Sequence, residues 1–300
     1  MKITLTGASG FLGGRLVSRL MDQGHTLHIL GRSRPKGAVS FSPWNAVKEE
    51  PPREALEGAE AVIHLAGEPV AQRWTPEVKE RIRTSRVNGT NALVKVLGSL
   101  PVRPKVLIAA SAIGFYGERG DDLCTEATTP GTGFLPEVCV EWEKSAEAAR
   151  AFGIRVVLIR IGIVLGPNGG ALEKMLPPFR MGVGGVIGDG RQWMSWIHVD
   201  DVVGLMLHAL ENQSLQGPVN ATAPRPVRNS ELTKALGRVL HRPTIFPVPT
   251  LALRVLYGEM AQIVLASQRV EPIVAQRSGY VFRYADLLPA LQDLLGPQTR

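Results

Sequence analysis

Cysteine is scarce in this 300-residue chain, which contains only Cys124 and Cys139. Two thiols are too few for a disulfide framework and do not have the spacing of a metal-binding motif, so we expect a reducing compartment and no metal site. Long apolar runs are also missing. The stretch 156–165 is interrupted by Arg160 and is far shorter than the roughly 20 residues that a membrane-spanning helix needs.

The N-terminus has no apolar signal-peptide segment, because a glycine-rich motif begins at Gly7; we therefore predict a cytoplasmic protein without a membrane anchor. Aromatic residues are few, at 6%, and they do not interleave with the scattered basic residues that give the net charge of +7. This pattern argues against nucleic-acid binding. The 44% hydrophobic content is typical of a globular protein with a substantial core.

The most informative motif that is present covers residues 3–14, which read ITLTGASGFLGG. Apolar and β-branched residues precede the glycines, and Leu12, Leu16 and Leu20 follow at helical spacing. A strand, a glycine turn and a helix start are predicted here, with free helix N–H groups facing a pyrophosphate. An ordinary strand-to-helix turn is the alternative, and the flanking pattern disfavours it.

The end of the next predicted strand, residues 26–30, is the position that distinguishes NAD from NADP in such folds. Arg32 and Arg34 follow the strand, with no acidic residue between Gly31 and Arg34. Arginines present forked donors to a 2′-phosphate, which favours NADP(H). The alternative is that these arginines are only solvated surface charges.

Strands and helices alternate along the rest of the chain, and this pattern predicts an α/β protein with a Rossmann-like, doubly wound parallel sheet. We expect little regular structure over 33–58 and a mobile substrate-side loop over 167–190. The predicted domains are 1–245, which binds the dinucleotide, and 246–300, a small C-terminal region that packs over the substrate side of the cleft. Further strands are expected at 61–67, 105–111 and 155–160, and helices at 76–97, 142–151, 202–210 and 287–295.

Ser111 ends one of these strands, and Tyr116 lies just beyond it. The carboxyl ends of parallel strands face the ligand crevice, so Ser111 is a candidate site residue; a hydroxyl that stabilises a neighbouring turn is the alternative. His198 is more readily explained as a brace at a strand-to-helix junction than as a catalytic base. Asp200 or Asp201 is expected to cap the helix that follows.

Taken together, these features resemble the short-chain dehydrogenase/reductase superfamily, specifically its extended, sugar-nucleotide-epimerase-like branch. A narrower resemblance is to the atypical "epimerase family" proteins related to human short-chain dehydrogenase family 39U member 1, which in bacteria are often labelled cell-division inhibitor or nucleoside-diphosphate-sugar epimerase. The motifs that carry it are Thr6-Gly7-x-x-Gly10-Phe11-x-Gly13, Leu65-Ala66-Gly67, Ser85-Arg86, Asn88-Gly89-Thr90, Ser111-x-x-x-Phe115-Tyr116-Gly117, Trp142-Glu143, Arg160-x-Gly162-x-Val164-Leu165-Gly166, Ile197-His198-Val199 and Gln268-Arg269-Val270.

The resemblance implies a binding site for NADP(H). The residues that it assigns to the cofactor are Thr6, Gly7, Gly10, Phe11, Leu12, Gly13, Arg32, Leu65, Ala66, Gly67, Arg86, Ser111 and Val164.

The catalytic half of the resemblance is incomplete, because no Tyr-x-x-x-Lys sequence occurs in the chain. Alignment on Trp142-Glu143 places Leu135 and Cys139 at those two positions, and neither side chain can replace the pair. Ser111 remains from the catalytic set, and Tyr116 is the candidate replacement acid. The chain is therefore expected to be an oxidoreductase or epimerase-like enzyme that acts on an unknown small molecule.

The missing pair also leaves two other hypotheses open. One is a non-catalytic, NADPH-responsive regulator or scaffold with a protein partner, in line with the cell-division label of its bacterial relatives. The other is an inactive enzyme retained for its structure.

Overall fold

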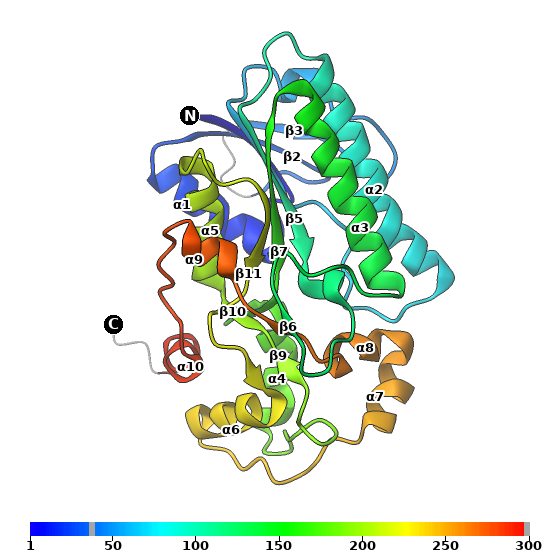
Figure 1. Cartoon of the computed structure of the whole chain (residues 1–300), viewed down its shortest axis with the longest axis vertical. Coiled ribbons are helices and arrows are strands. Elements are labelled where there is room, and N and C mark those ends of the chain that lie inside the picture. Colours follow the sequence, from blue (N-terminus) through cyan, green and yellow to red (C-terminus); the bar gives the residue numbers. More distant parts are fainter. Residues whose placement is uncertain (36–39, 297–300) are drawn as a thin grey trace.

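A seven-stranded parallel sheet forms the centre of the computed structural model, which describes residues 1–35 and 40–296. The strand order is β11-β7-β5-β4-β1-β2-β3, and every neighbouring pair is parallel (Figure 1). This arrangement confirms the prediction of a doubly wound, Rossmann-like α/β fold. The strands are β1 (Lys2–Thr6), β2 (Thr26–Gly31), β3 (Ser40–Pro43), β4 (Ala61–His64), β5 (Val106–Ala112), β7 (Arg155–Ile161) and β11 (Gly217–Ala221).

Helices cover both faces of the sheet (Figure 1). On one face, Leu16 and Leu20 of α1 pack with buried residues of α5 against the central strands. On the other face, Leu93 and Leu97 of α2 bury the opposite side of the same strands. The strands between these layers are apolar on both sides, as expected for a parallel sheet. The covering helices are α1 (Phe11–Asp22), α2 (Pro76–Ser99), α3 (Phe134–Glu147) and α5 (Val199–Glu211).

Below the carboxyl ends of the strands, a second core is built around Trp196 and Leu291. Helices α4 (Gly170–Arg180), α6 (Asn229–Leu240) and α10 (Leu287–Leu295) surround it. Short strands join this part to the sheet through three two-stranded pairs, β8–β10, β9–β12 and β6–β13. The remaining elements are β6 (Leu123–Cys124), β8 (Ile163–Gly166), β9 (Trp193–Met194), β10 (Trp196–His198), β12 (Val227–Arg228), β13 (Arg269–Val270), α7 (Thr250–Tyr257), α8 (Gln262–Leu265), α9 (Ile273–Arg277), η1 (Arg53–Ala55), η2 (Ile113–Tyr116), η3 (Ala148–Phe152) and η4 (Gly258–Ala261).

Three sequence predictions need correction. The segment 33–58 contains the edge strand β3 and the short helix η1, while residues 36–39 within it lie outside the described part. The segment 167–190, predicted as a loop, contains helix α4. Helix α3 begins at Phe134, eight residues before the predicted start at Trp142.

The N-terminus of α5 also differs from the prediction. The cap is His198, whose Nδ1 accepts a hydrogen bond from the Asp200 N–H at 3.1 Å. Asp200 and Asp201 lie inside the first turn instead. The buried Asp201 carboxylate accepts bonds from the N–H groups of Arg283 and Tyr284, at 2.8 and 2.9 Å, and so anchors the C-terminal segment. The interpretation of His198 as a brace at the junction is confirmed.

The C-terminal segment touches both parts of the molecule. Strand β13 pairs with β6, α9 packs against β11, and α10 packs against α6. The domain boundary at 245/246 stays a prediction. The predicted closing helix is confirmed as α10, whereas Pro297, predicted with Gly296 to stop it, lies outside the described residues.

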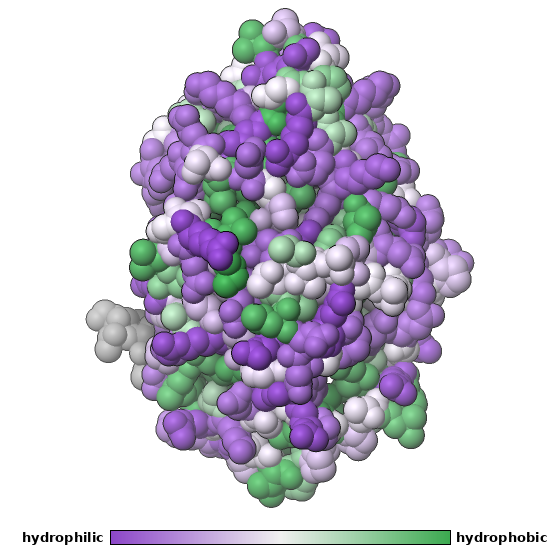
Figure 2. Space-filling model, in the orientation of Figure 1, coloured by the Kyte–Doolittle hydropathy of each residue, from purple (hydrophilic) through white to green (hydrophobic). Residues whose placement is uncertain are grey.

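Helix α7 buries none of its residues. Leu251, Val255 and Leu256 are 70, 69 and 66% exposed. Hydrophobic side chains are visible at the lower end of the otherwise largely hydrophilic face in Figure 2. None of the helices in the described ranges is both long enough and apolar enough to cross a membrane.

Candidate functional site

The turn between β1 and α1 has the geometry that its glycines predict. Gly7 has φ +75°, and a Cβ placed on it would lie 2.7 Å from the carbonyl carbon of Leu65. A Cβ on Gly13 would lie 2.2 Å from the Gly7 oxygen. Both positions therefore require glycine, so that the start of α1 can lie against the ends of β1 and β4.

The N-terminus of α1 is not blocked by the chain itself. Gly10 is the N-cap in extended conformation, with no side-chain cap and no acidic residue in the first turn. The first N–H groups of a helix lack intrahelical partners, and the helix dipole adds positive potential there. Thr6, Gly7, Gly10 and Phe11–Gly13, six of the predicted cofactor residues, thus lie at one turn, whose N–H groups are of the kind that binds anions in other proteins.

The loop after β4 is fixed to this turn through Thr6. Its hydroxyl oxygen accepts hydrogen bonds from the N–H groups of Leu65 and Ala66, both at 3.1 Å. The same hydroxyl lies 2.8 Å from His64 Nδ1. Because two N–H groups already occupy the oxygen, its proton points to His64, and the predicted residues Leu65 and Ala66 are held beside the glycine turn.

His64 also contacts the helix layer that covers the sheet. Its Nε2 lies 3.1 Å from the Thr90 hydroxyl, which also accepts the indole N–H of Trp142 at 3.1 Å. Complete burial lowers the pKa of His64 to about 4, so the ring is neutral. Since Nδ1 is the acceptor for Thr6, the ring proton lies on Nε2 and is donated to Thr90.

The other predicted cofactor residues lie on both sides of the glycine turn. Arg32 is exposed just after β2, the neighbour of β1 on the side away from β4. Val164 lies half-buried on β8. The Phe11 ring fills the space next to Gly166 and Gly169, where an added Cβ would come within 2.2 Å of the ring.

Ser111 and Tyr116, the two predicted catalytic residues, belong to a buried polar cluster. Ser111 is 2% exposed and its hydroxyl donates to Glu143 Oε1 at 2.6 Å. Tyr116 is fully buried, donates to Asn220 Oδ1 at 2.7 Å and accepts from Arg160 Nη1 at 3.0 Å. The catalytic role of both hydroxyls stays a prediction, and their hydrogen bonds are made within the protein.

The centre of this cluster is the ion pair of Glu143 and Arg160. The guanidinium Nε and Nη2 each lie 2.8 Å from a carboxylate oxygen, and the guanidinium carbon is 3.5 Å from the centre of the Phe115 ring. Burial alone would lower the pKa of Arg160, but the hydrogen bonds and charge of Glu143 outweigh it, so the pKa is raised. In the sequence, both residues stand out only as motif positions. The charge of Arg160 within an apolar strand was the available signal for a buried pair.

Leu135 and Cys139, which the sequence alignment predicts at the tyrosine and lysine positions, face the chain after β5. A Cβ on Gly114 would lie 3.5 Å from Leu135 Cβ and 3.8 Å from Cys139 Sγ. Cys139 is 4% exposed, and burial raises the pKa of its thiol to about 12. The thiol is therefore neutral near pH 7, in agreement with its interpretation as a small buried residue.

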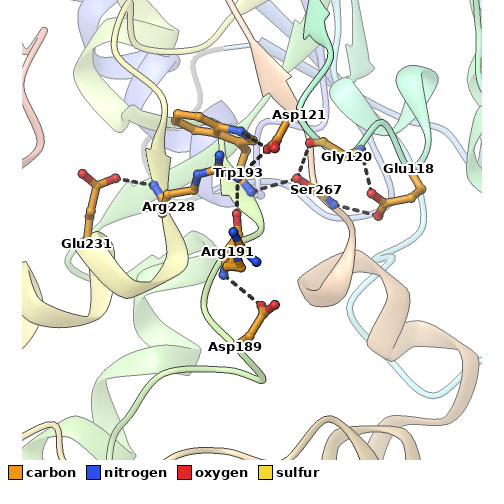
Figure 3. Close-up of polar contacts among 9 residues, drawn as sticks. All are labelled: Glu118, Gly120, Asp121, Asp189, Arg191, Trp193, Arg228, Glu231 and Ser267. Carbon is orange, nitrogen blue, oxygen red and sulfur yellow. Dashed lines mark hydrogen bonds and ion pairs between the residues drawn. The ribbon is translucent and has the colours of Figure 1, made fainter.

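On the surface, a network of hydrogen bonds and ion pairs connects the C-terminal segment to the loop after η2 (Figure 3). Asp121 accepts the indole N–H of Trp193 at 2.9 Å and Arg228 Nη1 at 2.6 Å. The Ser267 N–H donates to Glu118 Oε2 at 2.8 Å, while the Trp193 N–H donates to the Ser267 hydroxyl at 3.0 Å. The sequence carries no local pattern that predicts this network, because its members come from four distant segments.

Comparisons with known proteins agree with this geometry. The model of the NAD dependent epimerase/dehydratase family matches residues 3–221, and that of a domain of unknown function, DUF1731, matches residues 248–294. An Arabidopsis thaliana protein described as an epimerase family protein SDR39U1 homolog, chloroplastic, is 43% identical over 98% of this chain and 87% of its own length. The epimerase family protein YfhF of Bacillus subtilis is 39% identical over 98% of both chains.

Among solved structures, human epimerase family protein SDR39U1 (isoform 2) with NADPH aligns with a TM-score of 0.89 at 28% identity, covering 99% of this chain and 100% of the human one. A nucleoside-diphosphate sugar epimerase from Corynebacterium glutamicum aligns with a TM-score of 0.82 at 35% identity, covering 99% of this chain and 58% of that protein.

Proposed function

The chain belongs to the NAD dependent epimerase/dehydratase family, and on this premise we propose that it binds NADP(H) and acts as an oxidoreductase or epimerase-like enzyme. The observation that carries the proposal is the Gly7–Gly13 turn, where added Cβ atoms would collide and the helix N-terminus has no side-chain cap. The human relative with NADPH supports the choice of cofactor.

Each part of the cofactor would meet a different group of the predicted residues. The N–H groups at the start of α1 would hold the pyrophosphate, and Arg32 would hold the 2′-phosphate. Leu65 and Ala66 would support the middle of the cofactor from below. When bound, the nicotinamide supplies hydride chemistry. The protein would contribute orientation of the ring and exclusion of water, with Ser111 as the proposed proton donor, because the contacts of Tyr116 favour a stabilising role.

Calorimetric titration with NADPH and with NADH tests the binding proposal. Wild-type protein should bind NADPH more tightly than NADH, and Arg32→Ala should weaken NADPH binding selectively. Arg19→Ala removes an exposed positive charge from the last turn of α1 and serves as the control. If wild-type protein binds neither nucleotide, the glycine turn is a structural relic and the proposed function is refuted.

A second candidate function is a non-catalytic, NADPH-responsive regulator or scaffold. The hydrogen bonds that engage Ser111 and Tyr116, together with the apolar residues Leu135 and Cys139, favour this alternative. The two candidates differ in turnover. Consumption of NADPH with any member of a broad carbonyl library supports the enzyme, whereas a partner protein whose capture changes with NADPH occupancy supports the regulator.

A further inference from the structure

Arg86 carries a positive charge from α2 to the loop that follows β4. Its Nη1 donates to the carbonyl oxygens of Glu68 and Ile82, at 2.9 and 3.3 Å. A Cβ on Gly67 would lie 3.2 Å from the guanidinium carbon, and that carbon is 5.0 Å from the centre of a Trp142 ring. The half-buried guanidinium is thus packed between the loop and α3.

Arg86 forms no ion pair within the described part of the chain. It donates only to carbonyl oxygens there, and Cys139, its neighbour on α3, is a neutral thiol. The Glu68 carboxylate attracts the guanidinium but lies 3.7 Å from Arg81 and accepts a hydrogen bond from Gln72 at 3.3 Å. One carboxylate therefore faces two arginines, which leaves a net positive charge here. Burial lowers the pKa of Arg86, but a guanidinium remains charged at neutral pH. A fixed positive charge therefore lies against the 65–68 loop.

The strand order indicates which end of a dinucleotide would meet this charge. Arg32 follows β2, the glycine turn follows β1, and the 65–68 loop follows β4, so these three features lie in that order along one edge of the sheet. A cofactor with its 2′-phosphate at Arg32 and its pyrophosphate at the turn extends its nicotinamide end past β4 towards β5. Arg86 is on that side.

We propose that Arg86 makes the site selective for the reduced cofactor. The nicotinamide ring is neutral in NADPH and positively charged in NADP⁺, whereas the phosphates of the two forms are the same. A neighbouring net positive charge opposes binding of the oxidised ring only, and the phosphate contacts cancel in the ratio of the two affinities. This inference rests on the proposed NADP(H) site and adds redox-state discrimination to it.

The test is the ratio of the dissociation constants for NADP⁺ and NADPH, measured by calorimetry at low ionic strength. Wild-type protein should bind NADPH roughly tenfold more tightly than NADP⁺, as expected for like charges a few ångströms apart in a partly buried site. Arg86→Gln should bring the ratio close to one, and Arg86→Lys should retain most of it. Arg83→Gln removes the same charge from α2 at a position that pairs with Glu137 and Glu141, and should leave the ratio unchanged.

Each outcome has a separate meaning. Equal affinities of wild-type protein for the two forms would overturn the inference while leaving the NADP(H) site intact, as would an Arg86→Gln variant with the wild-type ratio. If Arg86→Gln does not fold, the wild-type ratio and the Arg86→Lys variant still decide. A wild-type protein that binds neither form refutes the proposed function itself.

Discussion

Replacing Arg160 by methionine tests how much the buried polar cluster contributes to stability. The side chains of Arg160 and Glu143 are only 5 and 9% exposed, and two hydrogen bonds of 2.8 Å connect them. Arg160→Met removes both bonds and leaves the Glu143 carboxylate buried with the Ser111 hydroxyl as its remaining partner from the cluster. Methionine keeps much of the apolar stem of the arginine.

Removing one partner of a buried pair typically costs about 3–5 kcal/mol, because the other charge is left uncompensated. We expect a loss of this size at pH 7, which lowers Tm by roughly 10 °C in a chain of this length.

Urea denaturation of wild-type protein and variants at pH 7 measures these free energies of unfolding. The double variant Arg160→Met/Glu143→Leu removes the stranded carboxylate and should recover much of the loss. The exposed pair of Arg150 and Glu147 provides the control, and Arg150→Met should cost less than about 1 kcal/mol. An Arg160→Met variant within 1 kcal/mol of wild type at pH 7 would refute the reasoning.

Three further predictions concern the proposed cofactor site and its surroundings. Gly13→Ala places a Cβ 2.2 Å from the Gly7 oxygen and should abolish NADPH binding in calorimetry, while Gly14→Ala, whose Cβ meets nothing closer than 3.8 Å, should bind normally. His64 has a folded pKa of about 4, below its unfolded value of about 6.5. Its contribution to stability is therefore complete above pH 6.5 and falls by roughly 3 kcal/mol towards pH 4, a dependence that His64→Gln should flatten in urea titrations. Tyr116→Phe should lower the free energy of unfolding by about 1–3 kcal/mol, because the buried Asn220 and Arg160 groups lose a partner, without changing the NADPH affinity.

Much of the fold follows from local sequence pattern. The strands β4, β5 and β7 at the centre of the sheet are mostly apolar runs, and such runs identify a buried parallel sheet without knowledge of its neighbours. Helix α4 was not predicted from its sequence pattern because Pro177 and Pro178 lie within it. Each proline removes a helical N–H, and the cost is offset by the burial of Leu172, Leu176 and Phe179 in a core that only the folded chain forms.

In the candidate site, too, some features could be predicted from local sequence and others could not. The glycine turn could be predicted because its requirements lie within one stretch of sequence and one backbone conformation. The contacts of Ser111 could not, because they depend on which side of β5 its hydroxyl faces and on Glu143, 32 residues away. A strand-end position predicts that a residue is near the crevice, but it does not predict whether the side chain points into it.

The position of Tyr116 decides how its hydroxyl can be used. Burial raises its pKa to about 12, and the opposing effect of the nearby Arg160 charge is not large enough to cancel the shift. A general acid acts best when its pKa is near the working pH, and this phenol already donates its proton to Asn220. Transfer to a substrate would break that bond and leave a phenolate in a buried site. These contacts therefore favour a stabilising role, in which Tyr116 joins η2 to the ends of β7 and β11. Loss of NADPH turnover in a Tyr116→Phe variant that keeps wild-type stability would contradict this conclusion.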